Sequence, residues 1–248
     1  MAERQDDPGT ARCRWKTPDL PGLIGRPHMR ADFSLLESGI FTVPEAALLM
    51  GQKQSLVRVW IEGHTRKQSP VIDNELGRVD GKTAVSFTNL MELRFVAFFA
   101  PHVGLQEIRK IMDEAKATLG HPHPFATRTV FKTDGKKIVA EIAYRTGKVD
   151  IYDLRSRNLE MRTVVWNSLK NDVTYDPLGQ AVSWRPRPHI APNVIVHPRF
   201  AFGQPVLKKS RIPTKVLAKA VQVEGSMKFV ADIFEVPIKS VREAVKFE

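Results

Sequence analysis

The chain has 248 residues, of which 42% are hydrophobic, and its 38 Lys and Arg residues outnumber its 27 Asp and Glu residues, for a formal net charge of +11. This hydrophobic content excludes a disordered chain, and the length suffices for one large or two medium domains. The single cysteine, Cys13, excludes a disulfide framework and a cysteine-rich zinc site within one chain, while the positive charge suits a polyanionic partner.

The N-terminal residues 1–31 mix Arg, Asp, Pro and Gly without periodicity, and we expect them to form a flexible tail. They contain no hydrophobic region of the kind found in signal peptides. The longest apolar stretches of the chain, such as residues 95–100, are far shorter than a membrane span. Together with the single cysteine, these features predict a cytoplasmic protein that does not associate with membranes.

Residues 41–64 predict two short helices joined by a glycine. Thr42 is a candidate N-cap, and Glu45 places a negative charge in the first turn, where helices favour it. Gly51 can adopt the left-handed conformation that ends a helix. Over residues 54–62 the apolar side chains recur at helical spacing, so one face of the second helix should pack and the other should face outward.

This spacing resembles a helix-turn-helix, in which the second helix enters the major groove of DNA. Ala47 is small where the helices cross, Gly51 lies in the turn, and Val57 and Trp60 follow at the expected intervals. Gln52 departs from the motif, which usually has an apolar residue there, and the alternative is an ordinary helical hairpin inside a core. The residues of this motif that are predicted to bind DNA are Lys53, Gln54, Ser55, Arg58, Arg66 and Lys67.

Residues 69–87 contain two glycine turns between short apolar runs and predict a hairpin or wing that brings Arg78 or Lys82 to the DNA backbone. Two helices should follow, one over residues 87–100 that is capped by Ser86 and one over residues 105–119 that ends at Gly120. Helix-turn-helix, wing and two helices together resemble the DNA-binding half of MerR-type regulators. Residues 32–120 are therefore predicted to form one domain of this kind.

Residues 121–186 are predicted to form a strand-rich region. Polar and apolar residues alternate over residues 125–154, with turn signals at Asp134-Gly135 and Thr146-Gly147, so we expect three antiparallel strands there. Residues 180–186 predict a fourth strand, and residues 161–169 fit either a helix or a strand. Three prolines in residues 185–193 favour an extended connector, and residues 187–193 are taken as the linker between domains.

Residues 194–248 predict a strand, a glycine-proline turn and three helices that begin near Pro213, Ser226 and Ile238. The last two helices repeat the spacing of the first helix-turn-helix, with Glu235 in the place of the turn glycine. Lys239 and Arg242 make the last helix a second candidate for DNA binding, so which motif reads the bases stays open. The whole chain is thus predicted to be α+β, with a winged MerR-like helix-turn-helix, a small antiparallel sheet and a C-terminal three-helix domain that is itself helix-turn-helix-like.

A second resemblance rests on residues of this C-terminal part, namely Gly203-Gln204-Pro205-Val206, Arg211-Ile212-Pro213-Thr214, Leu217, Gly225-Ser226, Val230-Ala231, Val241, Ala244 and Phe247. They closely resemble a small conserved domain of VapB-type antitoxins from type II toxin-antitoxin modules. The family usually has a glycine-threonine pair where this chain has Lys209-Ser210. With the N-terminal helix-turn-helix included, the resemblance covers residues 41–248.

This resemblance implies a DNA-binding antitoxin that neutralises a PIN-domain ribonuclease toxin and represses its own operon as a homodimer. It implies no cofactor. In the conserved triplet, Arg211, Ile212 and Pro213 are the candidate toxin-binding residues. A MerR-like transcriptional regulator that responds to a small molecule, without a toxin partner, is the alternative function. A pure interaction scaffold that binds no specific DNA is a third.

No catalytic or metal-binding residue is predicted. His121 and His123 are two residues apart, but the prolines beside them and the lack of a nearby cysteine favour a simple loop. The Asp and Glu residues lack the spacing of a nuclease metal site, and no nucleophile elbow or Gly-rich phosphate loop accompanies them. The sequence therefore predicts a protein that is not an enzyme.

Overall fold

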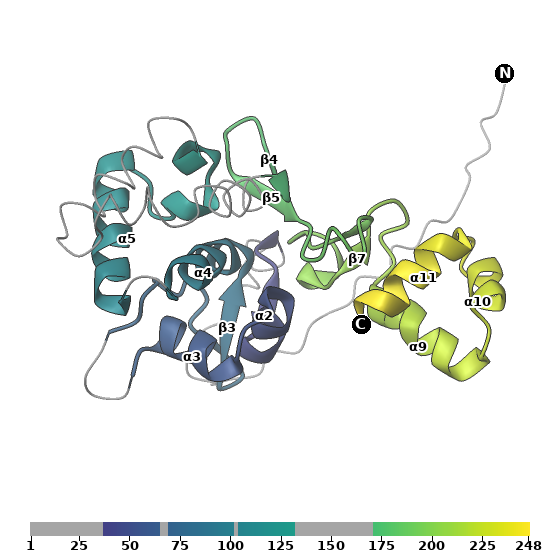
Figure 1. The fold of residues 1–248 in the computed structure, drawn as a ribbon. Helices are drawn as coiled ribbons and strands as arrows, with labels where there is room; N and C mark the ends of the chain where they lie inside the picture. The colour runs from purple at the N-terminus through teal and green to yellow at the C-terminus, as the bar shows by residue number, and fades with distance from the viewer. Residues whose placement is uncertain (1–36, 65–68, 102–103, 132–170) are drawn as a thin grey trace, which may run out of the picture. The chain divides into compact units, whose positions relative to one another are not determined.

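The computed structural model describes residues 37–64, 69–101, 104–131 and 171–248. All of them belong to one compact unit, residues 32–248. Among the described residues, seven α-helices and three small antiparallel sheets form an α+β fold (Figure 1). The predicted tail, the turns at Asp134-Gly135 and Thr146-Gly147, and residues 161–169 lie outside the described residues.

The first helix pair begins and ends at the residues that its local signals predict. Strand β1 (Ile40–Thr42) runs directly into α2 (Val43–Met50), and Thr42 and Glu45 form a reciprocal capping box across the start of this helix. The Thr42 backbone N–H donates to the Glu45 carboxylate at 2.8 Å. Gly51 ends the helix with φ +65°, in the left-handed region, and α3 (Gln54–Glu62) begins three residues later.

The buried side of α2 and α3 rests on α4 (Phe87–Phe99). Val57 and Trp60 of α3 join Ala47 of α2 and Leu90 of α4 in one hydrophobic cluster. The Ser86 hydroxyl accepts the Asn89 backbone N–H at 2.9 Å and caps α4, as predicted. Helix α5 (Leu105–Leu119) packs its apolar face inward and ends at Gly120, so both predicted helices after the hairpin are present.

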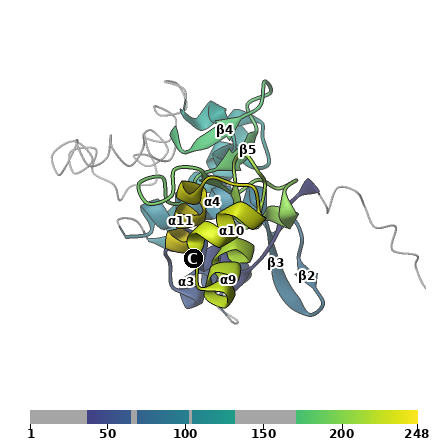
Figure 2. The same cartoon turned by 90° about the vertical axis from the view of Figure 1, so that its right-hand side faces the viewer.

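A three-stranded sheet of order β1-β3-β2 lies beside these helices. Its hairpin consists of β2 (Arg78–Val79) and β3 (Lys82–Ser86), in which Arg78 pairs with Thr83 (Figure 2). The two turn residues, Asp80 and Gly81, both have positive φ. Asp-Gly is the pair that such a two-residue turn favours, because its twist matches that of the strands.

The first predicted strand of the middle region is wrong at its start. Pro124–Ala126 and Arg128–Phe131 form two short 3₁₀ helices, η1 and η2, in place of a strand beginning at Phe125. Pro124 has no backbone N–H to donate to a ladder, and the consecutive residues Phe125 and Ala126 are both buried, which a half-buried strand with a period of two does not allow. The predicted fourth strand is present as β5 (Ala181–Trp184), paired with β4 (Val173–Tyr175).

The C-terminal part begins with β6 (Val194–Ile195) and β7 (Val206–Leu207), joined through the 3₁₀ turn η3 (Ala201–Gly203). Three helices follow and contact one another: α9 (Thr214–Glu224), α10 (Met227–Ile233) and α11 (Ile238–Phe247) (Figure 1). Glu235, which occupies the place of the turn glycine, adopts φ +51°. The backbone of Glu235 thus takes the left-handed conformation that glycine would adopt more easily.

The segment between the two parts is not simply extended. Residues 188–190 form a turn in which the Ile190 backbone N–H donates to the Arg187 carbonyl at 3.1 Å. The Arg187 guanidinium in turn donates to the carbonyl oxygens of Phe247 and Leu48. The domain boundary at residues 187–193 stays a prediction.

None of the helices in the described ranges has the length and apolar character needed to cross a bilayer.

Candidate nucleic-acid interface

The outward face of α3 carries the residues that the sequence singles out. Val57 and Trp60 are 0% and 2% exposed and fix the buried side of the helix. On the other side, the helix exposes Gln54, Ser55 and Arg58, and Lys53 is exposed at its N-cap. Residues three or four positions apart neighbour each other on a helix, so Arg58 adjoins both Gln54 and Ser55. The structure therefore brings these four polar residues together at one end of one helix.

The sequence interpretation missed one contact of this face. Glu62 is exposed one turn beyond Arg58, and its carboxylate accepts the hydroxyl of Thr83 from strand β3. This hydrogen bond joins the end of α3 to the β2–β3 hairpin. The helical period places Glu62 outward, but only the register of β3 against its neighbours brings Thr83 to it.

Two asparagine side chains hold the loop that precedes the hairpin. One belongs to the loop itself, and the other belongs to α4. The Asn74 carboxamide accepts the backbone N–H groups of Leu76 and Gly77, both at 3.2 Å. Asn89, which is buried in α4, donates to the Asp73 carbonyl at 2.7 Å and accepts the Glu75 backbone N–H at 3.0 Å. Arg78 and Lys82 are thus exposed on a hairpin whose preceding loop is held by these hydrogen bonds.

An ionic cluster that is only partly buried lies behind this loop. The His123 ring contacts two carboxylates, with Nε2 at 3.0 Å from Glu75 and Nδ1 at 3.1 Å from Glu92. Glu75 and then Glu92, through these hydrogen bonds, raise the pKa of His123 to about 10. Burial raises the pKa of Glu92; burial also acts to raise the pKa of Glu75, but the hydrogen bonds from His123 and Ser86 outweigh it and lower that pKa. The cluster ties η1 to α4 and to the loop before the hairpin.

The histidine pair of this region is therefore not arranged as a metal-binding pair. The His121 ring accepts the His123 backbone N–H at Nδ1 and contacts the Gln180 side chain at Nε2, whereas His123 faces the two glutamates. Within the described ranges, no group of three or more His, Cys, Asp and Glu residues is arranged to hold a metal ion.

The remaining predicted site residues lie elsewhere. Lys239 and Arg242 are both exposed on α11, so they do not share an element with the residues of α3. Arg211 is exposed, while Ile212 and Pro213 are half-buried. The predicted phosphate contacts Arg66 and Lys67 lie outside the described residues.

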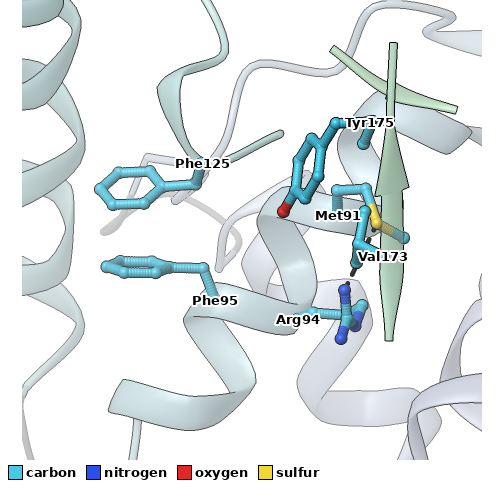
Figure 3. A pocket seen from close by; sticks show the side chains of 7 residues that line it. Met91, Arg94, Phe95, Phe125, Val173 and Tyr175 are labelled. Atoms are coloured by element: carbon cyan, nitrogen blue, oxygen red, sulfur yellow. Dashed lines mark hydrogen bonds between the residues drawn. The ribbon is translucent and has the colours of Figure 1, made fainter. Parts of the chain in front are cut away.

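A small cavity lies between α4 and the β4–β5 hairpin (Figure 3). Phe95 and Phe125 stack at its wall with their ring centroids 3.6 Å apart, and Arg94 contacts the Met91 sulfur at 3.4 Å. Its volume of about 10 Å³ is room for one water molecule, whereas pockets for small molecules hold several hundred cubic ångströms. This cavity therefore does not support the alternative of a regulator that binds a metabolite here.

The chain is similar to proteins of Mycobacterium tuberculosis. No protein-family model matches the chain. The chain is distantly homologous to a Mycobacterium tuberculosis protein described as "Putative antitoxin VapB45", with 23% identity over 223 residues that cover 83% of this chain and 92% of the relative. Its fold matches the crystal structure of Rv2018 from Mycobacterium tuberculosis with a TM-score of 0.67 and 22% identity, over 83% of this chain and 96% of that one. The α+β chain thus shares its fold with Rv2018 and is a distant homologue of the protein described as "Putative antitoxin VapB45".

Proposed function

We propose that the protein is a DNA-binding antitoxin, which reads operator DNA with its N-terminal helix-turn-helix and neutralises a PIN-domain ribonuclease toxin. In this proposal α3 is the recognition helix and the β2–β3 hairpin is the wing of a MerR-like domain. The observation that carries the DNA-binding half is the face of α3, where Gln54, Ser55 and Arg58 are exposed and the opposite side is fully packed. A helix held in this way can enter the major groove without losing its own core contacts.

The residue types of α3 suit the reading of base edges. A guanidinium forms two hydrogen bonds with guanine, and a carboxamide forms two with adenine, so Arg58 and Gln54 are the proposed specificity residues. Lys53, Arg78 and Lys82 would contact phosphates, which fix the position of the protein but do not distinguish sequences. The hydrogen bond between Thr83 and Glu62 would hold helix and wing at a constant spacing.

The antitoxin half of the proposal rests on the distant homology to the antitoxin relative. We assign toxin binding to the C-terminal unit, residues 194–248, because this is the part that resembles small free-standing antitoxins. Within it, Arg211 offers an exposed guanidinium beside the half-buried Ile212 and Pro213. The functional form would be a cytoplasmic homodimer that represses its own operon.

The DNA-binding half is tested by measuring the affinity of single variants for the operator and for unrelated DNA. Arg58→Ala should cost about 1–3 kcal/mol of operator binding and relax the sequence preference, because one base contact is lost. Lys82→Ala should weaken binding to all sequences alike. Arg242→Ala, on α11, is the matched control and should leave operator binding unchanged; the reverse pattern would make α11 the base reader.

The antitoxin half is tested by co-expression with a PIN-domain ribonuclease encoded next to this chain. The two proteins should co-purify, the ribonuclease should lose activity in the complex, and growth should be rescued. A chain that bound operator DNA but no such ribonuclease would instead be a plain transcriptional regulator.

A further inference from the structure

Backbone strain is concentrated on one part of the C-terminal unit. Ala201, Phe202 and Arg211 have φ of +46°, +57° and +59°, in the left-handed region that residues with a side chain rarely adopt. Ala201 and Phe202 are consecutive, and Arg211 follows the β7 strand that pairs with β6. Such conformations persist only where the surrounding structure holds them, and they are frequent at binding sites.

The turn is held by its contact with the N-terminal strand β1. Gly203 lies so close to the Phe41 ring that a Cβ atom at this position would be 2.6 Å from the ring carbon Cζ. The Gly203 backbone N–H also donates to the Phe200 carbonyl at 2.9 Å. With Gly203 fixed in this way, the preceding Phe202 is turned outward, and 62% of its surface is exposed.

An ordered stack of side chains accompanies the exposed ring. The rings of His197 and Phe200 are nearly parallel, at 16°, with centroids 4.0 Å apart. The Arg211 guanidinium carbon lies 4.4 Å from the centroid of the Phe200 ring, which is a cation–π distance. This stacking restricts an arginine that is otherwise exposed. We call Phe202, Arg211 and the stack of His197 and Phe200 the 197–211 surface.

The charge near this surface is mainly positive. Arg199, Lys208 and Lys209 are exposed in the same two loops, and Arg199 makes an ion pair with Glu37 at 3.1 Å. Positive charge on one partner favours a negatively charged patch on the other, both for encounter and for orientation. The charge of these two loops therefore suits an acidic partner.

We propose that the 197–211 surface is the docking site for an acidic face of a protein partner, with Phe202 as the anchor and Arg211 as the carboxylate-binding group. Aromatic and arginine side chains dominate the binding energy of protein interfaces. A ring already held outward and a guanidinium already stacked lose little freedom on binding, which strengthens an interface of modest size. The identity of the partner rests on the proposed function: it is the ribonuclease toxin.

There are two alternatives to this assignment: DNA as the partner of the 197–211 surface, and α10 as the docking site for the toxin. Double-stranded DNA presents base edges in grooves that a helix enters, and a single phenyl ring on a turn reads none of them. Helix α10 exposes Phe229 and Ile233, which are four residues apart on one face, but neither residue has a positive φ, and within the described part of the chain no cation–π contact holds either ring or side chain outward. Phe229, at 51% exposure, therefore serves as a control of nearly equal exposure.

The test measures the affinity of the full chain for the purified ribonuclease. Phe202→Asn removes the ring and keeps the turn, because Asn tolerates the left-handed conformation. It should raise Kd by about 30-fold or more, the usual size of an interface hot spot. Arg211→Gln should raise Kd by about tenfold and reduce the salt dependence of the association rate. The matched control Phe229→Asn should change Kd by less than about threefold, and thermal unfolding should show that all three variants fold.

The possible outcomes separate the two proposals. Binding that survives both Phe202→Asn and Arg211→Gln overturns the 197–211 surface alone, and loss of binding in Phe229→Asn only would move the docking site to α10. If the two substitutions weaken operator DNA instead of the ribonuclease, the surface binds nucleic acid and the proposal is wrong. A wild-type chain that does not bind the ribonuclease overturns the antitoxin function and this surface with it.

Discussion

At the scale of single residues, the most consequential contacts are those of His123 with its two glutamates. Glu92 is fully buried, and removing a carboxylate from water is costly unless an opposite charge or a donor meets it. His123 supplies both, at 3.1 Å from Glu92 and 3.0 Å from Glu75. The protonated imidazole is therefore part of the folded structure.

The stability of the protein should depend on pH through this histidine. Because the pKa of His123 is raised to about 10, from about 6.5 in an unfolded chain, the native state binds its proton more tightly than the unfolded state does. The contribution is complete below about pH 6.5 and is lost as the pH rises through 10. We expect the free energy of unfolding, measured by urea titration, to fall between pH 7 and pH 9.5 more steeply in the wild type than in His123→Gln.

His121→Gln is the control for this measurement, because the His121 side chain contacts Gln180 and not a carboxylate. Its slope with pH should match that of the wild type. Equal slopes in the wild type and in His123→Gln would show that the contacts with Glu75 and Glu92 do not hold the proton.

The roles of residues that act on their neighbours in sequence were predictable, whereas contacts between distant residues were not. Thr42, Gly51 and Ser86 act through groups within a few positions, so their capping roles follow from the sequence and are present in the structure. The carboxylates around His123 come from two other parts of the chain. No local pattern could assign them, and the prediction of a simple loop missed the cluster.

At the scale of elements, the turn between α2 and α3 sets the orientation of α3, the proposed recognition helix. Gly51 has φ +65°, and no atom lies within 4 Å of the position that a Cβ would take. A side chain there would meet no steric obstacle, so its cost is the backbone conformation alone. A substitution at Gly51 therefore measures the backbone preference for the left-handed region without a contribution from packing.

Gly51→Ala should lower the free energy of unfolding by about 1–2 kcal/mol, the cost of a left-handed alanine. Gly51→Asn should cost less, since Asn enters this region more readily. Thermal or urea unfolding of the three proteins measures both differences. An alanine variant as stable as the wild type would mean that the turn relaxes to another conformation.

The hydrogen bond between Glu62 and Thr83 is the element-scale contact that we expect to matter for DNA binding. Thr83→Val removes the hydroxyl at nearly constant volume, and Thr83→Ser keeps it. The valine variant should bind the operator more weakly, by about 1 kcal/mol or less, because the bond is exposed and its effect on the wing is indirect. Equal affinity in the valine and serine variants would show that helix and wing keep their spacing without it.

Elements were predictable where their signals were local and periodic. The two helices of the first motif, the Asp-Gly hairpin and the three C-terminal helices all begin near their predicted residues. The strand expected at Phe125 is absent because the segment begins directly after Pro124 and contains two consecutive buried side chains, Phe125 and Ala126. The face of α3 was likewise predictable from its period, whereas its contact with Thr83 depends on strand register.

At the scale of the whole molecule, net charge governs the strength of the proposed DNA complex. If a homodimer neutralises about 6–10 phosphates, Kd for operator DNA should rise by about three to five decades between 50 and 200 mM salt. Lys82→Ala should reduce the slope of log Kd against log salt by about 1 for each copy of the residue. Fluorescence anisotropy at several salt concentrations measures both. A flat titration would contradict the proposed DNA function.

The contact between Gly203 and Phe41 links two positions that lie far apart in the chain. A side chain at position 203 would collide with the Phe41 ring, and the φ of +92° there is unfavourable to any residue but glycine. A smaller residue at position 41 would relieve the collision but not the backbone cost. Among homologous sequences, we therefore expect coevolution in one direction: position 203 should depart from glycine only in chains where position 41 has already lost its aromatic ring, whereas a constant glycine at position 203 sets no such condition on position 41.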